Sequence, residues 1–313
     1  MIYALLSVWA LCVLLILREK RVARVIIYMT IFSLISSVAY LFLSAPDVAM
    51  AEAAISAFTT VFFIICFERY FRHKDKDKQE KPEERKNIIR ILLPIVFTVI
   101  VFVLFIFVVP YEQAAFDLPA LYISRFMYDV GGENAVTAVL LDYRIYDTLF
   151  EALIIVVGVV AVIHLSHRKK LEVKAGEHSD VEKDGMAVFA IRVICPIMVL
   201  FGIYLVLNGH ISPGGGFQGG LAIASFFICR YLIYDVYDLP IKKLGKMEEI
   251  FFAGLVIVAV FIVFLGVTSD VPEAIRPFVQ TSYLLAVNAL IGLKVACGFI
   301  ILFYRYIAVE RRK

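Results

Sequence analysis

Charged residues are scarce in this chain. They make up 19% of the 313 residues, while 62% are hydrophobic, and the net charge is only +3. A soluble globular domain has about 25% charged and about 45–50% apolar residues, so the mean hydropathy of +0.87 excludes a water-soluble fold. The small net charge also provides no basic surface for nucleic acid. We therefore predict a membrane protein that lies in the lipid bilayer and binds no nucleic acid.

Paired cysteines and metal-ligand patterns are missing as well. The chain has five cysteines but no C-x-x-C motif and no Cys/His spacing typical of a metal site. All of them lie within or at the edge of apolar segments: Cys12, Cys66, Cys195, Cys229 and Cys297. We interpret them as small apolar residues. We accordingly expect no disulfide, iron–sulfur cluster, zinc or other cofactor in this chain, and no catalytic residues.

Long apolar runs dominate what is present. A helix needs about 20 apolar residues to cross about 30 Å of hydrocarbon. Nine runs are long enough or nearly so: residues 2–17, 25–43, 48–67, 91–109, 148–165, 186–207, 221–237, 250–267 and 283–303. The first run has no basic residue before it, which favours a retained span over a cleaved signal. The pattern predicts an all-α polytopic membrane protein with about nine transmembrane helices.

The basic residues give these helices an orientation. The connections after the first, third, fifth and seventh runs and the C-terminal tail contain 4, 9, 5, 4 and 4 Lys or Arg residues. The connections after the second, fourth, sixth and eighth runs contain 0, 2, 0 and 1. Because cytoplasmic loops carry the excess of Lys and Arg, we expect the N-terminus outside and the C-terminus in the cytoplasm.

Two of the cytoplasmic connections divide the chain. Residues 68–90 and 167–184 are rich in charges of both signs, as solvated linkers are. They separate three blocks, which we delimit as 1–85 with three helices, 86–178 with two and 179–313 with four. The outer connection 110–147 is long and partly apolar, so we expect an interfacial helix around residues 134–141. No internal repeat of the kind found in many carriers is evident.

A glycine-rich segment, residues 208–220, joins the sixth and seventh predicted helices on the outer side. Its centre favours an irregular backbone because it consists of Pro213, Gly214, Gly215, Gly216 and Phe217. One interpretation is a sharp turn. The other is a re-entrant loop whose amides and His210 face a polar cavity, since irregular backbone at membrane depth needs hydrogen-bond partners. No Lys-Ser/Thr follows the glycines, so nucleotide binding is not expected.

Ionisable residues at membrane depth are costly and are therefore candidates for ion translocation. Lys294 lies near the middle of the ninth run, and Glu151 lies one turn beyond Asp147 on the same face of the fifth. Structural roles are the alternative, because Lys294 can pair with another helix and Asp147 can cap its own. We take as candidates Glu151, Lys294, Glu52, Asp147 and His210.

Three segments resemble subunits of known membrane complexes. Residues 202–221, with the string NGHISPGGGFQGG, resemble the signature of the B subunit of Mrp-type multisubunit Na⁺/H⁺ antiporters and its equivalent in membrane-bound hydrogenases. Residues 45–56, APDVAMAEAAIS, resemble the three-helix C-terminal module of the antiporter A subunit. Residues 134–151 resemble the two-helix module that follows it. The borders of the three resemblances coincide with the two charged connections.

The resemblance implies a fused membrane-arm subunit of an Mrp-type cation/proton antiporter module in a prokaryotic cytoplasmic membrane. Its partners would be other membrane subunits, and Na⁺, H⁺ or both would be the transported ions. The antiporter A subunit is expected to have a glutamate where this chain has Ser56, and the surroundings of Lys294 are more similar to hydrogenase and sulfur-reductase relatives. These departures favour a redox-driven respiratory complex. A stand-alone antiporter subunit and a purely structural scaffold are the alternatives.

Overall fold

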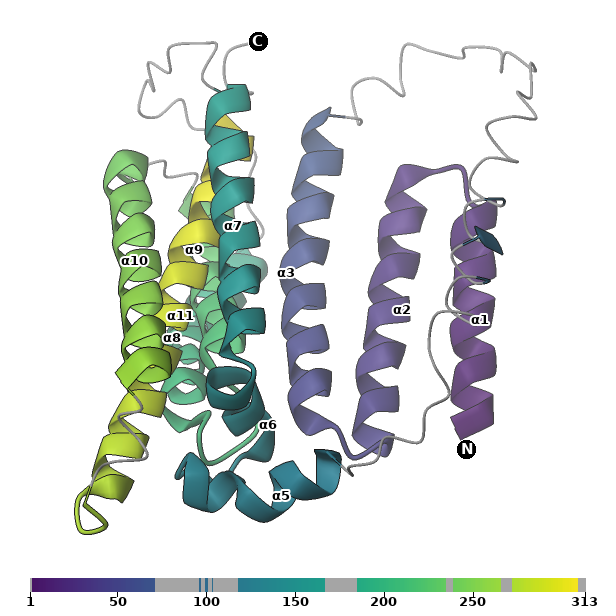
Figure 1. The fold of residues 1–313 in the computed structure, drawn as a ribbon. Coiled ribbons are helices and arrows are strands. Elements are labelled where there is room, and N and C mark those ends of the chain that lie inside the picture. Colours follow the sequence, from purple (N-terminus) through teal and green to yellow (C-terminus); the bar gives the residue numbers. More distant parts are fainter. Residues whose placement is uncertain are drawn as a thin grey trace.

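The protein is built from helices packed side by side (Figure 1). The computed structural model describes residues 2–70, 118–166, 185–234, 239–265 and 272–308, with the isolated positions 96, 99, 100 and 103. Every regular element within these ranges is helical. Five of the described helices are long and apolar enough to cross a membrane, and they span Val22–Phe42, Pro46–Phe67, Ile145–His164, Val188–Asn208 and Arg276–Arg305. The prediction of an all-α, multi-pass membrane protein is confirmed.

The first block forms a row of three antiparallel helices, α1 (Ile2–Arg18), α2 (Val22–Phe42) and α3 (Pro46–Tyr70) (Figure 1). Polar side chains connect them within the apolar surroundings. The indole nitrogen of Trp9 donates to Ser36 Oγ over 2.8 Å, and the hydroxyls of Thr30 and Thr60 are 2.8 Å apart. Hydrogen bonds between helices suit a membrane, where apolar surface gives no preference for a neighbouring helix over lipid.

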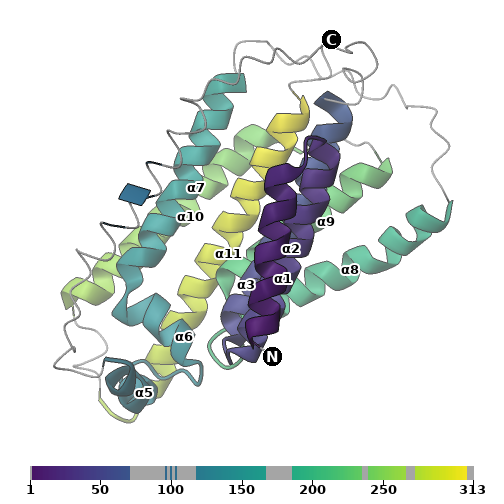
Figure 2. The same ribbon diagram turned by 90° about the vertical axis from the view of Figure 1, so that its right-hand side faces the viewer.

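The second block begins, within the described residues, with α5 (Leu118–Asp129), which lies across the outer end of the molecule (Figures 1 and 2). It is followed by the short α6 (Ala135–Ala138), the π-helical turn η1 (Val139–Tyr143) and α7 (Ile145–Ser166). The helix expected around residues 134–141 is thus present as α6 and η1. The predicted span at 91–109 lies outside the described residues except for its four described positions, which are helical.

The third block contains α8 (Gly185–Asn208), α9 (Gly216–Tyr234), α10 (Ile241–Leu265) and α11 (Arg276–Ala308). Helix α9 packs closely on both α8 and α11, and glycines make this possible. A Cβ atom added to Gly219 would lie 2.5 Å from the carbonyl oxygen of Gly202 on α8. A Cβ atom added to Gly220 would lie 2.4 Å from the carbonyl oxygen of Gly292 on α11. Small residues let membrane helices approach to backbone contact.

The first and second blocks both pack against the third. Helix α3 contacts α9, and α7 contacts α10 and α11. The aromatic ring of Phe58 on α3 meets Phe299 on α11 edge-on, with ring centroids 4.8 Å apart. Helix α11 is the central element, since 67% of its spanning window is buried, against 22% or less in the other four candidate spans.

Two expected helix boundaries differ from the observed ones. Helix α9 begins at Gly216, so the second half of the glycine-rich segment is helical and not irregular. Glycine is tolerated there because its missing side chain allows the close packing described above. Helix α10 begins at Ile241, although the apolar run begins only at residue 250. This extension brings a charged segment, including Glu248, into the helix and next to α11.

Candidate functional site: a buried ion pair and a three-way junction

Lys294 forms an ion pair in the interior of the third block. Its Nζ lies 3.0 Å from Oε1 of Glu248 on α10, and the exposed side-chain fractions of the two residues are 0% and 2%. The ammonium also lies 5.7 Å from the centroid of the Phe252 ring. A buried charge is tolerated only when a partner compensates for the lost hydration. The sequence thus identified Lys294 correctly as a buried charge but missed its partner.

A sequence signal for Glu248 exists in retrospect. Helix α10 buries a stripe at helical spacing that includes Leu255 and Ala259, with Phe252 and Leu244 partly buried on the same side. Glu248 is one turn before Phe252 and continues this stripe towards the N-terminus. Following the helical period beyond the apolar run would have placed its carboxylate against α11.

Glu151 is the second acid near Lys294. Helices α7 and α11 run in parallel, and Ile155 of α7 meets Gly298 of α11, where an added Cβ would lie 2.7 Å from the Ile155 side chain. Glu151 and Lys294 each lie one turn before these residues, and their opposite charges attract each other. Unlike Glu248, Glu151 is exposed on the surface of the molecule.

Glu52 and Asp147 lie apart from this pair. Glu52 is half-buried between α2 and α3 and accepts a hydrogen bond from the Ser33 hydroxyl. Asp147 is half-exposed in the first turn of α7 and pairs with Arg144. An exposed pair of this kind contributes little to stability, so Asp147 acts at most as a capping charge within the described residues.

The three blocks meet at a buried junction on the outer side. The Asn134 amide donates to Asp47 Oδ1 over 2.9 Å and to the carbonyl oxygens of Gly209 and Ser212 over 3.3 and 3.1 Å. Asn134 Oδ1 accepts from the first amides of α6, so one side chain caps a helix and connects the blocks. Asp47 and Asn134 are both 8% exposed. Asp47, which sequence reasoning treated as a local cap, is therefore a contact between distant segments.

The glycine-rich segment supplies the third side of the junction. His210 is buried, and its carbonyl oxygen accepts from the amides of Glu133 and Asn134 over 2.9 and 3.1 Å. The Gly214 amide donates to Asp47 Oδ1 over 3.2 Å, and the Gly216 amide donates to Asn288 Oδ1 over 3.1 Å. Gly214 and Gly215 have φ angles of 145° and 155°, which L side chains rarely adopt.

These contacts distinguish between the two interpretations of the segment. The segment is a tight connection whose amides are satisfied by Asp47 and Asn288, and Phe217 lies half-buried in the first turn of α9. Its backbone meets α3 and α11 through specific hydrogen bonds and does not line a polar cavity among the described residues. Pro213 is exposed at the tip, next to an apolar cleft.

Replacing Asn134 by Ala should destabilise the protein by about 1–3 kcal/mol, because buried oxygens of Asp47, Gly209 and Ser212 would each lose a hydrogen-bond donor. Thermal melting of the purified protein in detergent measures this change. The matched control is Glu133→Ala, which removes an exposed side chain and keeps the backbone bond to His210. Equal melting temperatures for Asn134→Ala and the control would show that the junction does not stabilise the fold.

A further pair of acids lies at the outer end. Asp142 in η1 is half-buried, and this burial, together with the nearby charge of Asp129, raises the pKa of Asp142 to about 6. Asp129 accepts a hydrogen bond from the Tyr143 hydroxyl over 2.8 Å. Within the described residues, no group of three or more His, Cys, Asp or Glu side chains is placed to hold a metal ion.

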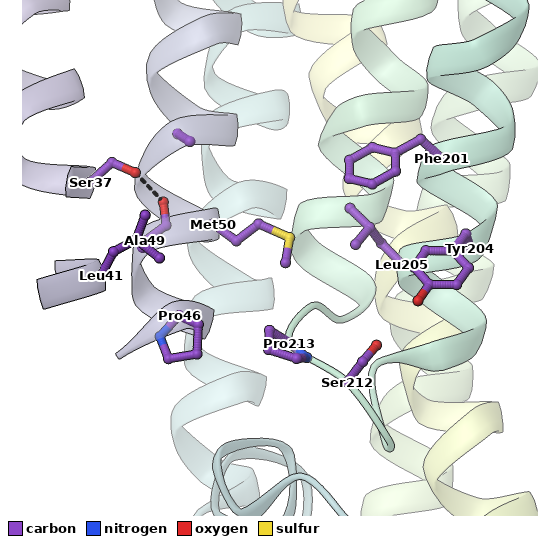
Figure 3. A pocket seen from close by; sticks show the side chains of 11 residues that line it. Ser37, Leu41, Pro46, Ala49, Met50, Phe201, Tyr204, Leu205, Ser212 and Pro213 are labelled. Atoms are coloured by element: carbon purple, nitrogen blue, oxygen red, sulfur yellow. Dashed lines mark hydrogen bonds between the residues drawn. The ribbon is translucent and has the colours of Figure 1, made fainter. Parts of the chain in front are cut away.

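An open apolar cleft of about 490 Å³ separates the first block from α8 (Figure 3). Met50 of α3 points across it towards Phe201 and Leu205 of α8, and the tip of the glycine-rich segment closes its outer end. Only a few polar groups line it, such as the Ser37 hydroxyl, which already donates to the Ala49 carbonyl oxygen over 2.7 Å. The cleft holds no charged residue and is separate from Lys294.

Comparison with known families agrees with the division into blocks. Residues 186–303 match the family described as a domain related to the MnhB subunit of Na⁺/H⁺ antiporter. Residues 7–72 match the MbhD family, which is described as one of the subunits of MBH. The resemblance that the sequence motifs predicted, a fused subunit similar to the antiporter A subunit at its start and to the B subunit at its end, is confirmed.

Individual relatives match parts of the chain. A protein of Methanocaldococcus jannaschii without an assigned function is 34% identical over 42% of this chain and 57% of its own length. The antiporter subunit mnhA2 of Staphylococcus saprophyticus is 28% identical over 42% of this chain and 16% of its own length. The antiporter subunit mnhB2 of Staphylococcus haemolyticus is 40% identical over 26% of this chain and 61% of its own length. The chain therefore spans only part of each of these relatives.

Solved structures share the fold. The Mrp complex of Dietzia sp. DQ12-45-1b contains a chain that superposes on 99% of this chain with a TM-score of 0.72 at 19% identity, and 35% of that chain is covered. The archaeal membrane-bound sulfane sulfur reductase contains a chain that superposes on 70% of this chain with a TM-score of 0.52 at 26% identity, and 97% of it is covered. The arrangement of all three blocks is thus that of an Mrp-type membrane subunit.

Proposed function

We propose that the protein is a membrane-arm subunit of an Mrp-type cation/proton antiporter module. The observation that carries this proposal is the joining of two antiporter-related regions in one fold that superposes on an Mrp-complex chain over nearly its full length. The protein assembles with other membrane subunits of the module. The module lies in the cytoplasmic membrane of a prokaryote, and Na⁺, H⁺ or both are the transported ions.

Within this module the chain contributes to ion translocation through the charges around Lys294. A lysine between two acids, one buried and one exposed, can change partner when an ion or proton approaches, because its charge depends on compensation by a neighbour. Glu151 and Lys294 are the primary residues of this pathway. Glu52, Asp147 and His210 are secondary candidates, since the structure places each of them in a separate environment.

The chain supplies no catalytic residues and holds no cofactor, so any redox chemistry belongs to other subunits of the same complex. The similarity to the sulfane sulfur reductase chain supports a redox-driven complex. The alternative, a purely structural scaffold, is favoured by the junction at Asn134, which connects the blocks without any exchangeable ion.

Purification of the intact complex tests this function. We expect an affinity-tagged chain, extracted from its native membrane in mild detergent, to co-purify with antiporter-type membrane subunits, identified by mass spectrometry. Co-purification with the soluble subunits of an oxidoreductase would further support the redox-driven form. A chain that is recovered alone from native membranes, fully folded, would contradict the proposal.

The proposed topology has nine transmembrane helices, with the N-terminus outside, the C-terminus in the cytoplasm and three modules at 1–85, 86–178 and 179–313. Both charged connections are then cytoplasmic. A membrane-impermeant thiol reagent should label Gln113→Cys, in the outer connection, on intact cells, whereas Lys74→Cys should react only after lysis. The unsubstituted chain controls for its native cysteines. Labelling of Lys74→Cys on intact cells would overturn this orientation.

A further inference from the structure

The exposed face of α7 combines apolar residues with one acid at membrane depth. Tyr146, Phe150, Ile154 and Val157 are 58%, 64%, 71% and 60% exposed, and Glu151 lies among them. The opposite face of α7 is buried against α10 and α11. An apolar stripe facing lipid would need no explanation, but a carboxylate within it does.

Glu151 lies too deep for its side chain to reach water. It follows the start of α7 by six residues, which corresponds to about 9 Å along the helix axis. Long Lys and Arg side chains can extend to the membrane interface from such a depth, but Glu has a shorter stem. An ionised Glu151 facing lipid would be strongly disfavoured, so this face needs a covering group that compensates for the charge.

The chain itself supplies only part of this compensation. Lys294 attracts Glu151, but its ammonium already pairs with Glu248 over 3.0 Å, so two carboxylates share one cation. The apolar run at 91–109 contains no charged residue, and its described members Val96, Val99, Ile100 and Val103 are 43–54% exposed. The uncompensated negative charge therefore calls for a cation from outside this chain.

We propose that the exposed face of α7 is the docking site for a transmembrane helix of another subunit, which presents a Lys, Arg or His side chain to Glu151. This proposal rests on the proposed function, because it requires a multisubunit membrane complex. The incoming helix packs over Ile154 and Val157, and Gly158, where an added Cβ would meet no other atom within 4 Å, leaves room for close approach. The cluster of Glu248, Lys294 and Glu151 then continues across a subunit boundary.

Photocrosslinking in the assembled complex tests the docking site. With p-benzoylphenylalanine in place of Ile154, illumination of native membranes should join this chain to another membrane subunit, and the crosslinked peptide should contain a Lys, Arg or His within one helical turn. The same probe in place of the adjacent Ile155, which faces Gly298, should crosslink only within this chain. A lipid adduct, an intrachain link to residues 91–109 or a link to a second copy would each overturn the proposal.

A charge-removal pair sharpens the test. Replacing the identified basic residue by Met should lower the Ile154 crosslink yield by about tenfold, which corresponds to about 1.4 kcal/mol of binding free energy. Combining it with Glu151→Gln should restore most of the yield, because neither side then buries an unpaired charge. Equal yields in all variants would contradict charge-specific docking. Crosslinking requires no ion transport, so failure here leaves the co-purification test of the proposed function independent.

Discussion

Replacing Glu248 by Ala should destabilise the protein by about 3–5 kcal/mol, because the ammonium of Lys294 would remain buried without its partner. The two residues are 2% and 0% exposed, so water cannot take the place of the carboxylate without opening the interface between α10 and α11. The expected result is a large drop in melting temperature and in the yield of monodisperse protein in detergent. The free energy is measured by denaturant titration in mixed micelles.

The adjacent acid provides a matched control. Glu249 has the same chemistry and helix position but is exposed, so Glu249→Ala should change the stability by less than about 0.5 kcal/mol. A second variant, Lys294→Met with Glu248→Met, removes both charges and should recover most of the stability lost in Glu248→Ala, as apolar replacements of buried pairs often do. If the double variant is less stable than Glu248→Ala, the ion pair is not the cause of the loss.

Alanine at Gly219 or Gly220 should disrupt the packing of α9. The added Cβ atoms would lie 2.5 and 2.4 Å from the carbonyl oxygens of Gly202 and Gly292. Because the neighbours are backbone atoms of other helices, relief requires the helices to separate. Overpacking of this kind typically costs about 1–3 kcal/mol per site and more where the surroundings are rigid. Size-exclusion chromatography and melting of each variant in detergent measure the loss.

Gly245 is the control for intrinsic helix propensity. It lies in α10, and a Cβ atom added there would meet no other atom within 4 Å. Gly245→Ala should leave the protein unchanged or raise its stability by about 0.5–1 kcal/mol, since alanine favours a helix over glycine. A Gly219→Ala protein that melts like Gly245→Ala would show that α8 and α9 do not pack through backbone contact.

Hydrophobic runs and charged connections were sufficient to predict much of the architecture. Eight of the nine predicted runs overlap described helices, and the ninth lies mostly outside the described residues. These features could be predicted because apolar length and loop charge act locally along the chain. The start of α10 was placed too late, because its first turns are polar on one side and apolar run length does not detect them.

The contacts between blocks could not be predicted in the same way. Asn134 and Asp47 are 87 positions apart, and neither residue differs in sequence from an ordinary helix cap. The pairing of Lys294 with Glu248 depends on how α10 and α11 are aligned, which no periodicity within either helix specifies. Lys294 was recognisable because a charge in an apolar run is costly by itself, whereas Glu248 became significant only through its neighbour.

Ion transport by the assembled complex tests the central proposal most directly. We expect Lys294→Met and Glu151→Gln, which keep approximate side-chain size, to lower the rate of coupled Na⁺ and H⁺ movement in membrane vesicles by about tenfold or more, equivalent to about 1.4 kcal/mol or more in the barrier. Each variant must first show normal amounts of all subunits in the complex. Variants that assemble normally and retain the full coupled transport rate would contradict a role for these charges in ion movement and would leave this chain as a scaffold.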